Sequence, residues 1–227
     1  MLPRMIPAMI ALGVLAAATP ADAVLLSGVG DPILDPALSG GTTITFDATT
    51  PGNYSSLTIG NVTFIGVDAP FTIGADFNGS FNTTGGQSLF NGSDLVPAQL
   101  QVNFATPVDA FAFNWGAADN QWLLSAFDAA NNLLEATLIP AVFSSNAGDF
   151  FGVAAAEIAF FTLVDQKNSA VNGDFVFIDS FTYRIGEDGT IPVSEPGTLG
   201  VLAMGLALFA IAARRRKVGL LGGGADR

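Results

Sequence analysis

Short runs in which hydrophobic and polar residues alternate, separated by turn residues, most strongly limit the folds open to the middle of this chain. Such alternation places successive side chains on opposite faces of a β-strand. We therefore expect strands in the segments 42–47, 56–67, 70–77, 100–115, 122–139, 158–163 and 175–185. This pattern predicts an all-β fold, an antiparallel β-sandwich of jelly-roll-like topology, with a barrel as the alternative.

Three of these segments contain turn signals that divide them. Gly60-Asn61, Thr106-Pro107 and Asn131-Asn132 each interrupt a run, and we expect one strand on each side of each dipeptide. The segment 152–157 is rich in alanine, which favours a helix. The β-branched and aromatic residues that follow favour a short turn there and a strand over 158–163.

The first 23 residues have the three parts of a secretory signal peptide. Arg4 supplies the positive region, residues 5–18 are apolar, and Ala21 and Ala23 form a small-x-small cleavage site. We expect Sec-type export, cleavage after Ala23 and a sandwich domain over residues 24–185. An uncleaved N-terminal anchor is the alternative.

The charge and composition of the exported part exclude several function classes. Residues 24–191 hold 17 acidic and two basic residues, a formal net charge of −15, which repels nucleic acid. The chain has neither cysteine nor histidine. Ser-His-Asp and Cys-His catalysis and the usual zinc sites are therefore excluded. Because no carboxylate lies in a recognisable catalytic motif, we expect a protein that is not an enzyme.

The C-terminal end combines a polar linker, an apolar stretch and a basic cluster. After the linker at 186–193, the segment 194–217 contains an expected helix over 197–213 and the cations Arg214, Arg215, Arg216 and Lys217. Cations flanking an apolar helix remain on the cytoplasmic side. We therefore expect a cytoplasmic tail at 218–227 and a sandwich domain outside the cytoplasm. A permanent C-terminal anchor is one interpretation.

The same segment, "SEPGTLGVLAMGLALFAIAARRRK", resembles the PEP-CTERM sorting signal of exosortase substrates. Glu195 and Pro196 match the second and third motif positions, Ser194 stands where the first proline is usual, and Gly197 follows. The resemblance implies a bacterial protein held briefly in the inner membrane and cut near the motif by an exosortase-type transpeptidase. Such proteins pass to the cell surface or extracellular matrix of bacteria that make exopolysaccharide or biofilm.

Two groups of polar and aromatic residues are candidates for ligand binding. Trp122, preceded by Asn120 and Gln121, has the composition of a glycan contact, whereas Trp115 alternates with phenylalanines and is expected in the core. Asp174 and Asp179, with Asp165 behind them, are candidate ligands of a structural Ca²⁺. A strand acid bonded to nearby backbone is the preferred interpretation of Asp179. No other cofactor is expected.

These observations predict a non-enzymatic exported surface or matrix protein. The alternative is a carbohydrate-binding module, in a calcium-dependent form or not, or a glycan-active enzyme delivered to the matrix.

Overall fold

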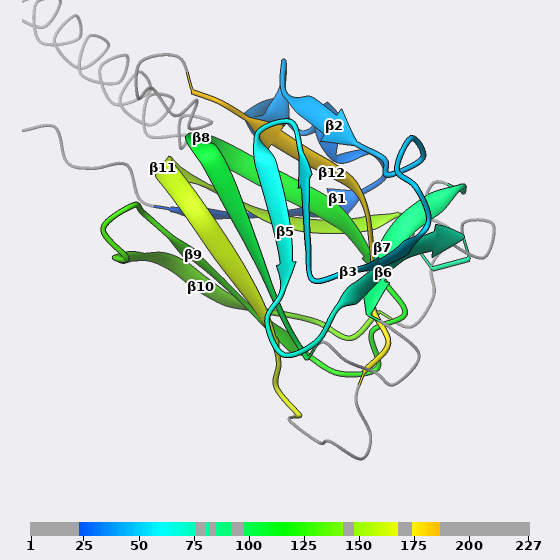
Figure 1. Ribbon diagram of the computed structural model, residues 1–227. Coiled ribbons are helices and arrows are strands. Elements are labelled where there is room, and N and C mark those ends of the chain that lie inside the picture. The colour runs from blue at the N-terminus through cyan, green and yellow to red at the C-terminus, as the bar shows by residue number, and fades with distance from the viewer. Residues whose placement is uncertain are drawn as a thin grey trace, which may run out of the picture.

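A computed structural model describes residues 23–75, 80–81, 85–91, 98–142, 148–167 and 174–186 (Figure 1). Its secondary structure is almost entirely β. The strands are β1 (Val24–Val29), β2 (Thr42–Ile44), β3 (Gly52–Tyr54), β4 (Ser56–Ile59), β5 (Val62–Gly66), β6 (Phe71–Ala75), β7 (Gln87–Asn91), β8 (Gln99–Gly116), β9 (Trp122–Phe127), β10 (Leu133–Ile139), β11 (Asp149–Asp165) and β12 (Phe177–Arg184). Two short 3-10 turns, η1 (Pro32–Leu34) and η2 (Pro36–Leu38), follow β1.

Every strand pair in the described part of the chain is antiparallel, and two long strands, β8 and β11, belong to both layers of the fold. The first part of β8 pairs with β5, and the last part pairs with β12. The first part of β11 pairs with β1, and the last part pairs with β9. Layer A therefore runs β4-β5-β8-β11-β9-β10, and layer B runs β1-β11-β8-β12-β7-β6-β3, with β2 also beside β12. The predicted antiparallel β-sandwich is confirmed.

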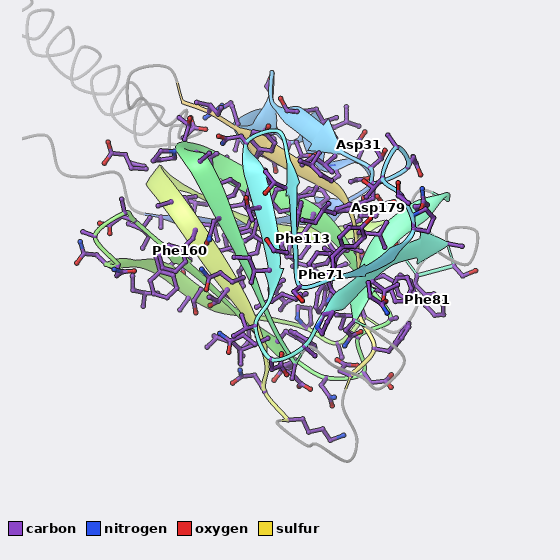
Figure 2. The ribbon with its side chains drawn as sticks, viewed as in Figure 1. Asp31, Phe71, Phe81, Phe113, Phe160 and Asp179 are labelled. Atoms are coloured by element: carbon purple, nitrogen blue, oxygen red, sulfur yellow. The ribbon has the colours of Figure 1, made fainter. Side chains whose placement is uncertain are left out.

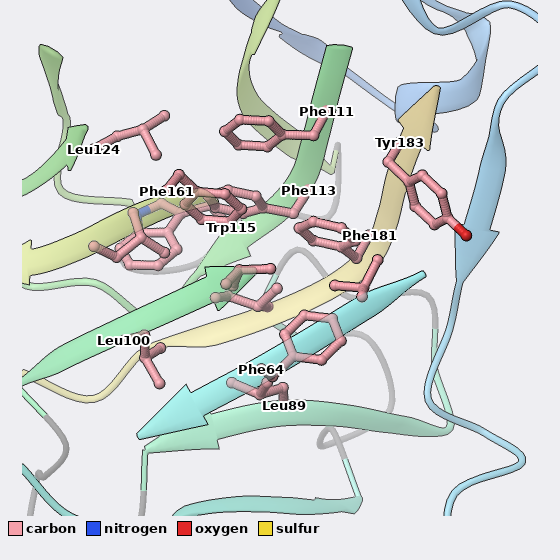
Figure 3. Close-up of a cluster of buried hydrophobic side chains, with 14 of the residues drawn as sticks. Phe64, Leu89, Leu100, Phe111, Phe113, Trp115, Leu124, Phe161, Phe181 and Tyr183 are labelled. Carbon is pink, nitrogen blue, oxygen red and sulfur yellow. The ribbon is translucent and has the colours of Figure 1, made fainter. Parts of the chain in front are cut away.

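Aromatic side chains from the two layers pack together between them (Figure 3). Phe111, Phe113 and Trp115 are fully buried and point inward at period two. Phe111 stacks on Phe161 of layer A with 4.1 Å between ring centroids, and Phe181 lies 5.2 Å from Phe64. Phe113 lies in the interior in Figure 2, whereas Phe160 lies nearer the periphery. The alternation seen in the sequence therefore has its physical basis in a main core that the two layers share, beside a smaller second cluster that includes Leu38 and Phe150.

The segment 100–115 is one strand, and the prediction of two strands meeting at Thr106-Pro107 was wrong. The Asn61 side chain accepts a bond from the Thr106 N–H and donates one to its carbonyl, both at 2.8 Å. The turn predicted at Gly60-Asn61 therefore binds β8 at Thr106, where this strand passes from one layer to the other. Because Pro107 has no N–H to donate, it is tolerated at such an irregular point.

The alanine-rich segment 152–157 is also strand, so the turn expected there was wrong. A β-bulge takes its place: the register of β11 against β8 shifts after Ala154, and Glu157 has a φ of 58°. A Cβ on Gly152 would lie 1.9 Å from the Phe111 carbonyl oxygen. Small residues therefore let β11 approach β8 closely, and the bulge bends the strand.

The start of β1 and the end of β12 lie at the same end of the molecule. Val24 is paired with Ala154, Ala154 with Ala110, and Ala110 with Arg184. With about 4.8 Å between neighbouring strands, Val24 and Arg184 are about 14 Å apart. We call this end, with the bends at 105–108 and 155–158, the terminal pole; it lies toward the left in Figure 1. The opposite end, with residues 116–121, 165–167 and 174, is the loop pole.

Candidate functional site

Asp174 is the centre of the loop pole. Its carboxylate accepts hydrogen bonds from the backbone N–H groups of Asp119 at 2.7 Å and Asn120 at 3.0 Å, and from the Trp122 indole at 2.8 Å. The residue is almost completely buried. One carboxylate thus joins the β8–β9 connection to the segment that leads into β12.

Asn91, at the end of β7, extends this network to a third segment. Its side-chain amide donates to the Asp174 carbonyl and accepts from the Val176 N–H at 2.8 Å. Asn91 is fully buried, as is Ser88 on the same strand. Sequence reasoning missed this role, because nothing near Asn91 in the sequence indicates a partner more than 80 residues away.

Burial raises the pKa of the Asp174 carboxyl above its ordinary value of 3.8. The N–H donors of Asp119, Trp122 and Asn120 act in the opposite direction, and the negative charge of Asp165 raises the pKa further. The net effect is upward because removing a carboxylate from water disfavours its charged form.

The structure corrects the prediction of a glycan contact at Trp122. Its side chain is completely buried, with its ring 5.6 Å from that of Trp115. A sugar cannot stack on a ring covered on both faces by protein. Asn120 is half-buried and its N–H is bound to Asp174; Gln121 is exposed, and its carbonyl accepts from the Gln166 N–H at 3.1 Å. Trp115 is in the core, as predicted.

The two candidate calcium ligands lie in different surroundings. Asp174 uses both carboxylate oxygens to accept N–H groups, and Asp179 is buried in β12, where it accepts the Ser180 N–H at 2.7 Å. Asp165 accepts the Lys167 N–H at 2.9 Å. No group of three or more acidic side chains within the described ranges is arranged to hold a metal ion. The bonds to nearby backbone favour the structural interpretation of Asp179.

A buried ion pair marks the terminal pole. The Arg184 guanidinium donates through Nε and Nη2 to the Asp109 carboxylate, with Nε 2.9 Å from Oδ1. Both side chains are largely buried. Arg184 is one of the two cations in residues 24–191 and the last residue of β12. The point where the chain leaves the sheet is therefore fixed by charge as well as by backbone pairing.

The residues predicted to direct sorting and membrane attachment lie outside the described residues. These are Ala21 of the cleavage site, the motif 194–197, the helix expected over 197–213 and the basic cluster 214–217. Ala23 is described and directly precedes β1. The part of the chain with described structure contains no helix that is long and apolar enough to cross a bilayer.

The described residues define an antiparallel β-sandwich, and a C-terminal segment follows it in the sequence. Residues 192–217 match the PEP-CTERM protein-sorting motif. The chain thus carries this sorting signal, which indicates an exosortase-targeted, exported surface protein.

The sandwich itself has a structural neighbour of low sequence similarity. It is the K1 cleaved adhesin domain of Lys-gingipain from Porphyromonas gingivalis W83, with 11% identity and a TM-score of 0.42. The match covers 65% of this chain and 99% of that one. No curated protein matches the sequence.

Proposed function

We propose that this protein is a non-enzymatic surface or matrix component, exported through the Sec machinery and held in the inner membrane by residues 194–217. An exosortase-type transpeptidase then releases it near Glu195-Pro196. The observation that carries the proposal is the sorting motif at 192–217, which follows the sandwich in the sequence. The resemblance to exosortase substrates supports an association with exopolysaccharide or biofilm.

The absence of an enzymatic role is supported by the residues available for chemistry. The sequence has no histidine and no cysteine. Asp174 is the most buried acid of the loop pole. Its carboxylate accepts hydrogen bonds from three N–H donors, and these bonds hold the loops in place. A catalytic acid needs an oxygen directed at a substrate, and this one has both oxygens directed at its own chain.

The alternative function, carbohydrate binding with or without calcium, has lost Trp122, one of the features that motivated it. With Trp122 in the core, Asn120 and Gln121 remain as polar groups without the adjacent ring. A glycan array with residues 24–189, in the presence and absence of Ca²⁺, tests this alternative directly. Saturable binding of one glycan class would restore it.

Cell fractionation of sorting variants tests the proposal. Deletion of residues 195–217 removes the motif and the anchor, and we expect loss of surface delivery. Pro196→Ala keeps the apolar stretch and the basic cluster, so we expect the uncut chain to accumulate in the inner membrane. Ser194→Pro completes the motif and serves as the matched control, with surface delivery at least as great as that of the natural chain. Unchanged surface delivery of the deletion variant would refute the proposal.

A further inference from the structure

The pairing register places both ends of the exported domain at the same pole. Val24 and Arg184 belong to one row of paired residues that crosses β1, β11, β8 and β12. The loops around Asp174 lie at the other end of these strands, because β12 enters layer B beside Gly116 and leaves it beside Ala110. β12 takes seven residue steps between the poles, a distance of about 23 Å.

From this geometry we infer that the domain has a fixed orientation at the surface that holds it: the terminal pole faces the membrane and the loop pole faces away. This inference rests on the proposed anchoring by residues 194–217. Nine residues, 187–195, join the described domain to Pro196. A random-coil chain of that length would have a root-mean-square end-to-end distance of about 17 Å, less than the distance between the poles.

The orientation does not depend on the stage of sorting. An uncleaved signal peptide would hold the domain at Val24, and the C-terminal segment holds it beyond Arg184; both points are at the terminal pole. After cleavage near Glu195-Pro196, the new carboxyl end follows β12 as before. Whatever acceptor receives the chain, the loops at 116–121 and 165–167 are presented outward.

The charge of the domain opposes an orientation set by lipid contact. Residues 24–191 carry a net charge of −15, and anionic headgroups repel such a surface. The tether at the terminal pole, and not adsorption, is therefore expected to determine which end faces the bilayer.

Single-cysteine labelling of the full chain tests this inference, because the sequence has no other thiol. Ala105→Cys places a label at the terminal pole and Gln121→Cys places one at the loop pole; both natural residues are exposed. Each labelled chain is reconstituted in vesicles of phosphatidylethanolamine and phosphatidylglycerol that carry an energy acceptor on their headgroups. We expect clearly higher energy transfer from position 105 than from position 121.

Flotation of the same vesicles distinguishes a failure of the proposed anchoring from a failure of the inferred orientation. A chain that does not float with lipid contradicts the proposed anchoring and the orientation with it. A chain that floats but gives equal or reversed transfer from the two positions leaves the anchor intact and overturns the orientation. Insertion of a long Gly-Ser segment after Gly189 provides the control, and we expect the difference between positions to shrink. A difference that persists unchanged would assign the orientation to lipid adsorption and overturn the tether argument.

Discussion

At the scale of single residues, Asp174 illustrates how one buried carboxylate can organise several loops. Asp174→Ala leaves three N–H donors without their acceptor, and the indole among them is fully buried. We expect the free energy of unfolding to fall by about 3 kcal/mol. Urea unfolding of residues 24–189 measures the change. Asp119→Asn keeps its backbone N–H and is the control, with an expected change within about 0.5 kcal/mol.

The raised pKa of Asp174 gives a second prediction, for the dependence of stability on pH. A carboxyl whose pKa is higher in the folded than in the unfolded state binds its proton more tightly when folded. The contribution of this carboxyl to stability is therefore greatest below pH 3.8, and it is lost as the pH rises through the pKa of the folded state. We expect the stability of the natural chain, relative to Asp174→Asn, to increase as pH falls. Carbon-13 NMR titration of the Asp174 carboxyl gives the pKa itself, and a value below 3.8 would contradict the prediction.

The pair of Asp109 and Arg184 gives a third prediction. Arg184→Met leaves the Asp109 carboxylate buried without its partner, and we expect a loss of about 3 kcal/mol. Asp109→Leu combined with Arg184→Met removes both charges and is expected to cost less than the single change. Lys167→Met, at the other cation, is the control with almost no effect. Thermal and urea unfolding of the natural chain and these three variants measures the differences in stability; a double variant less stable than Arg184→Met would contradict the prediction.

Single residues were the level at which sequence reasoning was least successful. Trp115 was placed correctly, because its period-two spacing from Phe111 and Phe113 is visible in the sequence. Trp122 was misplaced, because its neighbours are polar and its partner, Asp174, is 52 residues away. A local pattern shows which face a side chain occupies; it does not show which distant group meets it there.

At the scale of elements, the Asn61 turn and the bend of β8 form one unit. The Asn61 side chain makes two hydrogen bonds to the backbone of Thr106, and its carbonyl accepts the Ala105 N–H at 2.9 Å. Asn61→Ala removes the two side-chain bonds, and we expect a loss of about 1 kcal/mol, measured by urea unfolding. Asn53→Ala removes one exposed bond on the edge strand β3 and is expected to cost less. Equal losses for the two variants would contradict a special role for the bend.

The elements show a similar division between what was and was not predictable. The hairpin turn at Asn131-Asn132 was predictable, and Asn131 has a φ of 63°. The continuity of β8 and β11 could not be predicted from the sequence. Pro107 in β8 and the three alanines at 154–156 in β11 weaken the local preference for a strand. Pairing on both sides, with β5 and β12 for β8 and with β1 and β9 for β11, overrides that preference.

At the scale of the whole molecule, the shared strands imply that the two layers unfold together. Neither layer can lose β8 or β11 without disrupting the other, and the aromatic core lies between them. We expect a single cooperative transition in urea, with tryptophan fluorescence and far-ultraviolet circular dichroism coincident. Two separated transitions would show that one layer is stable alone.

The adjacency of Val24 and Arg184 also makes the sandwich a portable module. The two ends of this domain are about 14 Å apart, so it can be inserted into a surface loop of an unrelated host protein with short connectors and little distortion of the host. The same closeness permits head-to-tail cyclisation, or a circular permutant opened at another loop. The strand register that fixes the two ends thus makes the domain a candidate scaffold for displaying grafted sequences on the loops at its far end.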